Sequence, residues 1–274
     1  MLKVTQCICP VFKQSELHRK RTERIFRMKL KSWVITGLLG TAVFSQAQAA
    51  ELIQNGGFEV QGADSYDIPG WQVAEQGFLG SVLSQSGNVS EVTGNATVGA
   101  YQGTYYGLLD NYGLAGNVLY QSFTTAAVSQ ATLSFQMFIN NQNATTEIDA
   151  AGLDYSVDAT DHPNQHVRVD VLKAGSDPFS TNSADVLQSL YIGGENGGLA
   201  INNYVSYQFD LSSSLANGGS YLLRFATVAN QSSLQLGIDN VSLQTVSSVP
   251  EADSYALMLA GLGVIAAVMR RRYA

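Results

Sequence analysis

Alternation of apolar and polar side chains is the feature that most limits how this 274-residue chain can fold. A period of two residues predicts strands with one buried face. Gly- and Asn-rich breakers, such as those at 55–57 and 217–219, separate several of these segments, and no βαβ alternation appears. The pattern therefore predicts an all-β fold of two packed antiparallel sheets. The segments read as strands are 105–109, 118–123, 133–139, 166–172, 186–192, 205–211, 221–228 and 234–246.

The central segment, residues 50–248, has a length that suits one all-β domain. Both cysteines, Cys7 and Cys9, precede it, so the hydrophobic core, or the core together with a metal, has to hold the domain without disulfides. The segment contains 18 acidic side chains against three basic ones, which gives a net charge of −15 where the whole chain has −7. Such a body repels nucleic acid and anionic lipid and attracts cations. Its basic residues are Arg168, Lys173 and Arg224.

The N-terminal part of the chain has the pattern of an export signal. Residues 28–31 are basic, 33–44 are apolar without charge, and 47–49 form a small-residue cleavage site. This order predicts a signal peptide at 28–49, read by the Sec machinery and cut by signal peptidase. Residues 1–27 fit poorly ahead of it, and we interpret them as a start codon placed too early or as an extended leader.

The C-terminal segment 249–274 joins a polar motif, an apolar stretch at 255–269 and an arginine cluster. As a helix the apolar stretch reaches about 22 Å, against a hydrocarbon core of about 30 Å. It predicts a thin inner-membrane anchor whose arginines stay in the cytoplasm while the body lies across the membrane. An ordinary C-terminal anchor is the alternative, although such anchors run nearer to 20 apolar residues.

The order of residues in this segment resembles the PEP-CTERM sorting signal, which exosortase-type proteases process in Gram-negative bacteria that make extracellular polysaccharide. The resemblance implies processing by an exosortase and delivery to the cell surface or extracellular matrix. Ala252 stands where the family has a second proline, so the efficiency of cleavage stays open. The matching residues are Val249, Pro250, Glu251, Leu259, Gly261, Leu262, Arg270, Arg271 and Arg272.

The central segment is similar to galactose-binding-like jelly rolls, including carbohydrate-binding modules of families 4, 9 and 22. The resemblance implies a jelly-roll β-sandwich over 50–248 and a structural calcium ion near Glu59 and Asp239, completed by backbone carbonyls and Asn55 or Asn240. Calcium takes six to eight oxygen ligands. The alternative is a turn or bulge at residues 239 and 240 and a solvated Glu59. The segments that carry the resemblance are 52–59, 68–71, 105–110, 120–125, 131–135 and 237–243.

Sugar binding would use exposed aromatic faces beside amide and carboxylate groups. Tyrosine also suits half-buried strands, so a structural role is the alternative for each ring. We expect Trp71, which follows a Pro-Gly pair, to lie in the core instead of forming a sugar platform. The candidate ligand-binding residues are Tyr66, Tyr101, Tyr105, Tyr112, Asn111 and Asn140.

Residues 140–164 are acidic and weakly periodic, which favours a solvated flap at one end of the sandwich. His162 and His166 have a spacing that places them on one face of a strand or helix. Pro163 argues against a helix, and the glutamate of a zinc-protease motif is missing. We interpret them as a loop histidine and a strand-edge histidine instead of a metal site.

These observations predict a non-catalytic, exported matrix or envelope protein that associates with polysaccharide. A polysaccharide-active enzyme with paired carboxylates and a purely structural matrix protein are the alternatives. The sequence shows no Gly-x-Ser-x-Gly elbow, no phosphate-binding loop and no basic surface for nucleic acid. Carboxylates considered for an enzyme are Glu75, Glu91, Asp110, Glu147 and Glu195.

Overall fold

The structure is a computed structural model that describes residues 49–143, 146–194, 201–248 and 252–273. The predicted leader at 1–27 and the predicted signal peptide up to residue 48 lie outside the described residues. The sorting-signal residues Val249, Pro250 and Glu251 and the enzyme candidate Glu195 lie outside them as well.

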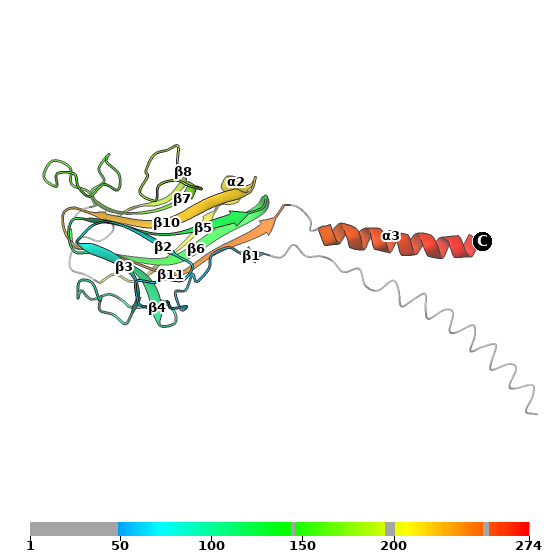
Figure 1. The fold of residues 1–274 in the computed structure, drawn as a ribbon, viewed down its shortest axis with the longest axis horizontal. Helices are drawn as coiled ribbons and strands as arrows, with labels where there is room; N and C mark the ends of the chain where they lie inside the picture. The colour runs from blue at the N-terminus through cyan, green and yellow to red at the C-terminus, as the bar shows by residue number, and fades with distance from the viewer. Residues whose placement is uncertain (1–48, 144–145, 195–200, 249–251, 274) are drawn as a thin grey trace, which may run out of the picture. The chain divides into compact units, whose positions relative to one another are not determined.

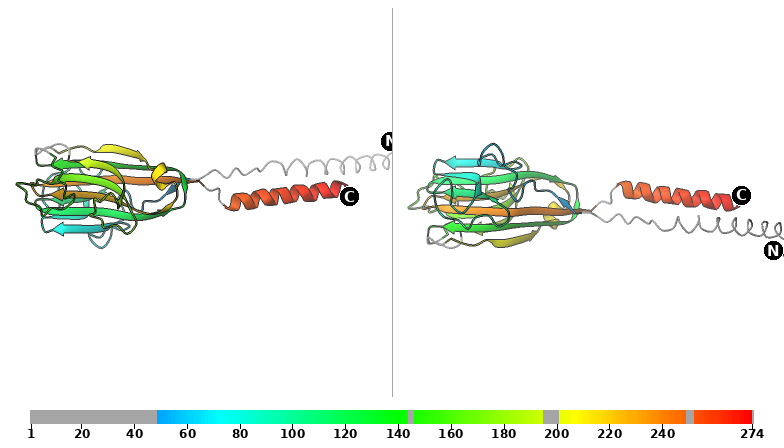
Figure 2. Two further views of the ribbon diagram at one scale, coloured as in Figure 1. Left: turned by 90° about the horizontal axis from the view of Figure 1, so that it is seen from above. Right: turned by 90° about the horizontal axis from the view of Figure 1, so that it is seen from below.

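Two antiparallel sheets stack as a β-sandwich (Figure 1), and the further views show them as separate layers (Figure 2). The first sheet has the order β3 (Gly80–Ser86), β4 (Tyr105–Asn111), β11 (Leu234–Ser247), β6 (Val128–Asn141) and β9 (Val205–Asp210), with β1 (Ala50–Glu51) paired to β11. The second sheet has the order β2 (Gln72–Gly77), β5 (Ala115–Thr125), β10 (Gly219–Ala229), β7 (Gln165–Lys173) and β8 (Val186–Gly193).

The chain crosses repeatedly between the sheets. Only β3 with β4 and β7 with β8 are neighbours both in sequence and in a sheet. The expected jelly-roll sandwich is confirmed, and each of the eight segments read as strands lies on one. The sequence reading did not include β1, β2 or β3. Both β2 and β3 are short and hold only two adjacent large or small apolar residues each, so neither shows the alternation by which strands were recognised.

The core lies between the sheets and is dominated by aliphatic and aromatic side chains from both inner faces. Trp71 belongs to it, as expected: its ring stacks on Phe58 at a centroid distance of 5.5 Å, and its Nε1–H donates to the carbonyl of Asn55 at 3.1 Å. A Cβ on Gly107 would lie 2.7 Å from the Phe58 ring, so glycine lets the residues that follow β1 approach β4 closely.

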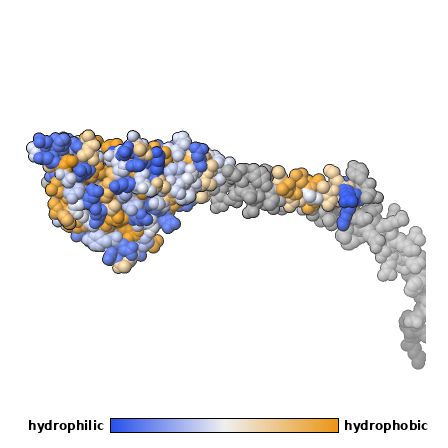
Figure 3. Space-filling model, turned by 45° about the horizontal axis from the view of Figure 1, so that its top comes forward, coloured by the Kyte–Doolittle hydropathy of each residue, from blue (hydrophilic) through white to orange (hydrophobic). Residues whose placement is uncertain are grey.

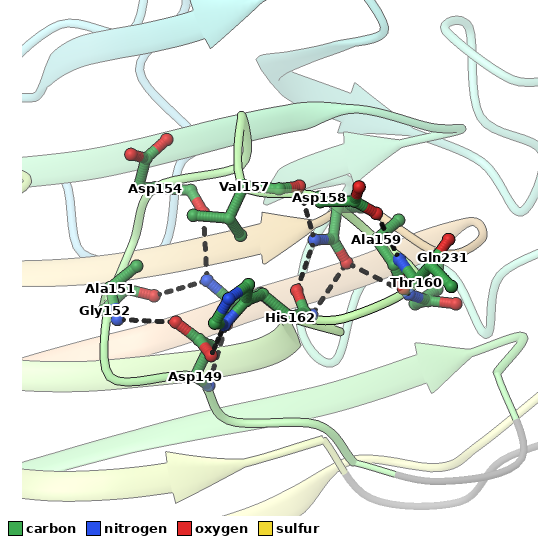
Figure 4. Close-up of polar contacts among 12 residues, drawn as sticks. Asp149, Ala151, Gly152, Asp154, Val157, Asp158, Ala159, Thr160, His162 and Gln231 are labelled. Carbon is green, nitrogen blue, oxygen red and sulfur yellow. Dashed lines mark hydrogen bonds and ion pairs between the residues drawn. The ribbon is translucent and has the colours of Figure 1, made fainter.

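The outer face of the second sheet is covered by loops. Leu153, from the segment predicted as a solvated flap, is buried and packs with Val118, Ala226 and Val228 of β5 and β10. Figure 4 shows how side chains fasten this loop to the sheet beneath it. The amide of Asn230 donates to the carbonyl of His162 at 3.0 Å, for example. Most of the loop is exposed or half-buried, as expected, but it is anchored to the sheet through the buried Leu153, which the sequence did not predict.

The acidic residues of this loop stabilise its turns. The carboxylates of Asp149, Asp154 and Asp158 each accept the backbone N–H two residues further along, at 2.7 to 2.8 Å. These are Asx-type turns, in which a short carboxylate replaces a backbone acceptor. Backbone N–H donors lower the pKa of Asp149 and of Asp158.

Two helices complete the described chain: α2 (Ser212–Leu215) and α3 (Ala252–Tyr273). The second contains the predicted helical stretch 255–269, and its last turn holds the three arginines, where a helix dipole favours positive charge. In Figure 3 the hydrophobic stretch of α3 gives way to a hydrophilic end. Within the described chain, no helix combines the length and apolar character that crossing a membrane requires. The predicted membrane-spanning role of 255–269 is thus not supported.

Candidate functional site

An open cavity of about 340 Å³ lies at the edge strand β3, where the segment that follows Phe58 crosses it. Its lining is polar apart from one aromatic ring and includes two carboxylates, one amide and three serine hydroxyls. The lining residues are Gln61, Gly62, Asp64, Ser65, Ser84, Ser86, Glu91 and Tyr105.

Strand register and two hydrogen bonds build this cavity. In the β3–β4 pairing Ser86 lies opposite Tyr105, and Ser84 lies on the same face two residues away. The backbone N–H of Ser84 donates to the carbonyl of Ser65 at 2.7 Å, and the amide of Gln61 donates to the Ser84 hydroxyl at 2.9 Å. The crossing segment is therefore fixed to the edge strand, and the cavity is part of the folded framework.

Each carboxylate at the cavity has one oxygen committed within the protein. Asp64 Oδ1 accepts the backbone N–H groups of Tyr66 and Asp67, and Glu91 Oε2 accepts the Ser65 hydroxyl at 3.2 Å. No described residue donates to Asp64 Oδ2 or Glu91 Oε1. These two oxygens can accept hydrogen bonds from a bound ligand.

Glu59 and Asp239, the residues predicted to bind calcium, hold the segment that leads into β4. Glu59 Oε1 accepts the backbone N–H groups of Thr104 at 2.7 Å and Tyr105 at 2.9 Å. Asp239 Oδ2 accepts those of Tyr101 at 2.9 Å and Gln102 at 3.0 Å. The two acids thus position the backbone of the cavity residue Tyr105.

Asp239 also begins a β-bulge. The β11–β6 register shifts between Asp239 and Ser242, and Asn240 has φ +50°. The bulge that the sequence left as an alternative to calcium is therefore present. Burial raises the pKa of Asp239, and the nearby negative charge of Glu59 raises it further.

Calcium binding at this pair stays a prediction. Asp239 Oδ1 accepts the N–H of Asn240, so three of the four carboxylate oxygens of Glu59 and Asp239 already have backbone donors. The Asn55 amide is engaged with the carbonyls of Val60 and Pro69. A cation would compete with these N–H groups, and Glu59 Oε2 is the oxygen to which no described residue donates.

The remaining candidate ligand residues are dispersed. Tyr66, Tyr101 and Tyr112 each expose about half of their surface, and none of them lines the cavity. Asn111 is fully buried, and Asn140 exposes 7 % of its surface. The Asn140 amide donates to Gln235 Oε1 at 3.1 Å, and its oxygen accepts the backbone N–H of Asn202.

Of the six predicted ligand residues, the structure brings only Tyr105 to the cavity. The two asparagine amides face partners inside the protein. Sequence reasoning missed most of the other lining residues because small polar residues next to a turn carry no periodic signal; they are Gln61, Gly62, Asp64, Ser65, Ser84 and Ser86.

The two histidines have separate roles. His162 is exposed in the loop, and its Nδ1 lies 3.1 Å from Asp149 Oδ2. His166 is buried on β7, where burial lowers its pKa to about 4. Among the described residues, no group of three or more His, Cys, Asp or Glu side chains is arranged to hold a metal ion.

The chain carries a PEP-CTERM protein-sorting motif, which matches residues 248–272. The match includes all of the sorting-signal residues predicted above. It makes this chain an exported protein of the cell surface or exterior. No curated protein sequence matches the chain.

Several solved structures are similar to this one. A bacteriophage CBA120 tailspike domain has 11 % identity and a TM-score of 0.40, with 72 % of this chain and 21 % of that chain covered. TmCBM61, solved with β-1,4-galactotriose, has 12 % identity and a TM-score of 0.40, with 71 % and 97 % covered. The K3 adhesin domain of Lys-gingipain from Porphyromonas gingivalis has 14 % identity and a TM-score of 0.41, with 72 % and 99 % covered.

This chain thus spans about a fifth of the length of the tailspike domain. All three TM-scores lie below 0.5, so this similarity does not identify a ligand for the present chain.

Proposed function

We propose that this chain is a non-catalytic, exported protein whose β-sandwich associates with polysaccharide through the cavity at β3. The cavity lining is the observation that carries the proposal. Sugar sites combine an aromatic ring with a few placed hydroxyl, amide and carboxylate groups, and this cavity has all four kinds around Tyr105.

The sorting motif supports a destination where polysaccharide is present. We propose that an exosortase-type protease processes the chain and that the body then remains at the cell surface or in the extracellular matrix. Ala252, in place of the family's second proline, is the position to test for slow processing. Pulse-chase detection of the processed form, with Ala252→Pro beside the native chain, measures it.

Binding of the purified full chain to the host's exopolysaccharide tests the proposed function. We expect Glu91→Gln and Asp64→Asn each to weaken binding roughly tenfold, because a hydrogen bond to a charged group contributes about 1.5 to 3 kcal/mol. Asp161→Asn removes an exposed carboxylate of the 142–164 loop and is the matched control. Absence of binding to any glycan, with or without calcium, would overturn the proposal.

Two carboxylates at one cavity favour a second candidate function, a glycoside hydrolase. Asp64 and Glu91 would then act as acid and base or nucleophile on a glycosidic bond. Incubation with the exopolysaccharide would release new reducing ends, and Glu91→Gln would abolish the release. Unchanged polymer length with retained binding would reject the enzyme and leave the binding function.

A further inference from the structure

We propose that the ligand of the β3 cavity carries free amino groups, as in a partly N-deacetylated hexosamine polymer, and is not a uronate or sulfated polysaccharide. This inference rests on the proposed function and narrows it to one chemical class of glycan. It depends on the distribution of charge in the sandwich, together with the hydroxyl and aromatic lining of the cavity.

The body of the protein has almost no positive charge to offer an anionic polymer. Of its three basic residues, Arg224 is fully buried and donates to Asp170 Oδ2 at 2.7 Å. Arg168 is buried beside it and donates to Asp170 Oδ1 at 3.0 Å. Lys173 is the only exposed cation, and its Nζ donates to the carbonyl of Ala184.

Recognition of carboxylate or sulfate groups normally uses Arg or Lys. No basic residue lines the cavity, whereas Asp64 and Glu91 do. An acidic sugar there would face two like charges inside a body of net charge −15. Anionic polysaccharide is therefore disfavoured both at the cavity and at longer range.

A protonated amine matches the groups that this cavity leaves open. An ammonium group has three donors and no acceptor. Asp64 Oδ2 and Glu91 Oε1 are the oxygens that no described residue bonds, and the half-buried Ser86 belongs to the same lining. Charge-assisted hydrogen bonds are roughly twice as strong as neutral ones, so an ammonium gains more here than a sugar hydroxyl does.

The remaining lining suits the rest of the sugar. Tyr105 lines the cavity while packing partly against the core, and the part of its ring that faces the cavity is of the kind that packs on the apolar face of a pyranose. Gln61 contributes an amide, and its contacts with the Phe58 carbonyl and Ser84 hydroxyl fix its position. The cavity is thus a mixed sugar surface with two acidic oxygens, so amine recognition adds selectivity to a general sugar contact.

A matched pair of oligosaccharides tests the inference. Chito-oligosaccharides of one length, fully N-deacetylated or fully N-acetylated, are titrated calorimetrically into the full chain at a pH where the amine is protonated. We expect the deacetylated oligomer to bind at least tenfold more tightly, with affinity falling as salt rises. Polygalacturonate should not bind.

Variants separate specific recognition from general attraction. Glu91→Gln and Asp64→Asn should each reduce the preference for the deacetylated oligomer about tenfold, with unchanged thermal unfolding as the folding control. Asp161→Asn, outside the cavity, should leave the preference unchanged. An equal loss in Asp161→Asn would mean that only the overall charge attracts the amine, and the inference would be overturned.

The two levels of the proposal fail in different ways. Equal binding of the acetylated and deacetylated oligomers, or tighter binding of polygalacturonate, would overturn amine recognition while polysaccharide association stands. No binding of any of these glycans or of the host exopolysaccharide would overturn both.

Discussion

The outer face of the second sheet and the β3 cavity both contain carboxylates, but those on the sheet are buried with partners and those at the cavity are open to solvent. On the second sheet, Asp170 lies between Arg168 and Arg224, and all three are buried under the covering loops. At the cavity, Asp64 and Glu91 each keep one oxygen to which no described residue donates. Charges closed off with partners define the fold, whereas charges left open to solvent are available for a ligand.

Coverage explains the difference between the two regions. Arg224 Nη1 donates to the carbonyls of Pro178 and Ser180 at 2.6 and 2.7 Å. The loop that covers the sheet therefore supplies hydrogen-bond acceptors for this buried arginine. Burial alone would raise the pKa of Asp170, but hydrogen bonds and charges from the two arginines outweigh it and lower that pKa. The cavity at β3 has only the segment 61–65 across one strand edge, and it stays open.

The largest effect should come from Asp170→Asn, which leaves the fully buried Arg224 without its anion. Breaking a buried ion pair on one side costs about 3–5 kcal/mol. Urea denaturation at neutral pH measures the loss. The triple variant Asp170→Leu with Arg168→Met and Arg224→Met should recover most of it, since both guanidinium partners of the carboxylate are then removed with it. A loss below about 1 kcal/mol in Asp170→Asn would mean that this face is not closed to water.

Stability should next depend on pH through His166. Neither ring nitrogen of this buried side chain has a hydrogen-bond partner among the described residues. Burial, with help from the charges of Arg168 and Arg224, lowers its pKa from 6.5 to about 4, against the opposing influence of the Glu147 backbone and the Asp170 charge. The unfolded chain therefore takes up this proton first as the pH falls.

Above pH 6.5 His166 is neutral in the folded and unfolded chains. As the pH falls from 6.5 towards 4, the unfolded chain takes up the proton, and the free energy of unfolding should fall by an amount on the order of 3 kcal/mol. Asp110 and Asp239 have raised pKa values because of burial, which gives the opposite slope when they protonate. Urea denaturation from pH 4 to 7, on the native chain and on His166→Leu, isolates the part of the pH dependence of stability that comes from His166. Parallel curves for the two proteins would refute the assignment.

Calcium tests whether the carboxylates of Glu59 and Asp239, which hold the segment leading to Tyr105, can still bind a ligand. If calcium binds at Glu59 and Asp239, saturating calcium should stabilise the chain by roughly 1–3 kcal/mol through binding to the folded state. Thermal denaturation with calcium and with chelator measures it, and Asp239→Ala should abolish the difference. An unchanged melting temperature in chelator would leave the two acids with their backbone contacts alone.

The smallest effect on stability should come from the cavity itself. Glu91→Gln keeps the side-chain shape and an oxygen that accepts the Ser65 hydroxyl. The free energy of unfolding should therefore change by no more than about 0.5 kcal/mol. Urea denaturation, run beside the glycan titrations, checks this. A loss above about 2 kcal/mol would place Glu91 with the closed, structural carboxylates and remove the contrast between the two regions.

Sequence periodicity predicts the central strands because each has a face that the core must bury. It says little about β2 and β3, whose few apolar residues are adjacent and do not alternate with polar ones. The cavity was hidden for the same reason, since Ser84 and Ser86 lie on one of these strands.

The burial of Asn111 and Asn140 could not be predicted either. The Asn111 amide donates to the carbonyl of Ala115 in the second sheet at 3.2 Å, and the segment that contains Asn202 covers Asn140, whose oxygen accepts the Asn202 backbone N–H at 2.9 Å. Which polar residue a loop covers is decided by tertiary packing, which a local pattern does not record.

The pairing of β1 with β11 has a consequence for the timing of export. Ala50 lies opposite Thr245, and β11 is bonded to β4 and β6 as well. The last strand to be synthesised is therefore the one on which most of the first sheet depends. If the chain crosses a membrane from its N-terminus, this sheet cannot be completed until residue 247 has passed. Because the sorting motif begins at residue 248, the final folding step would then come close in time to presentation of that motif.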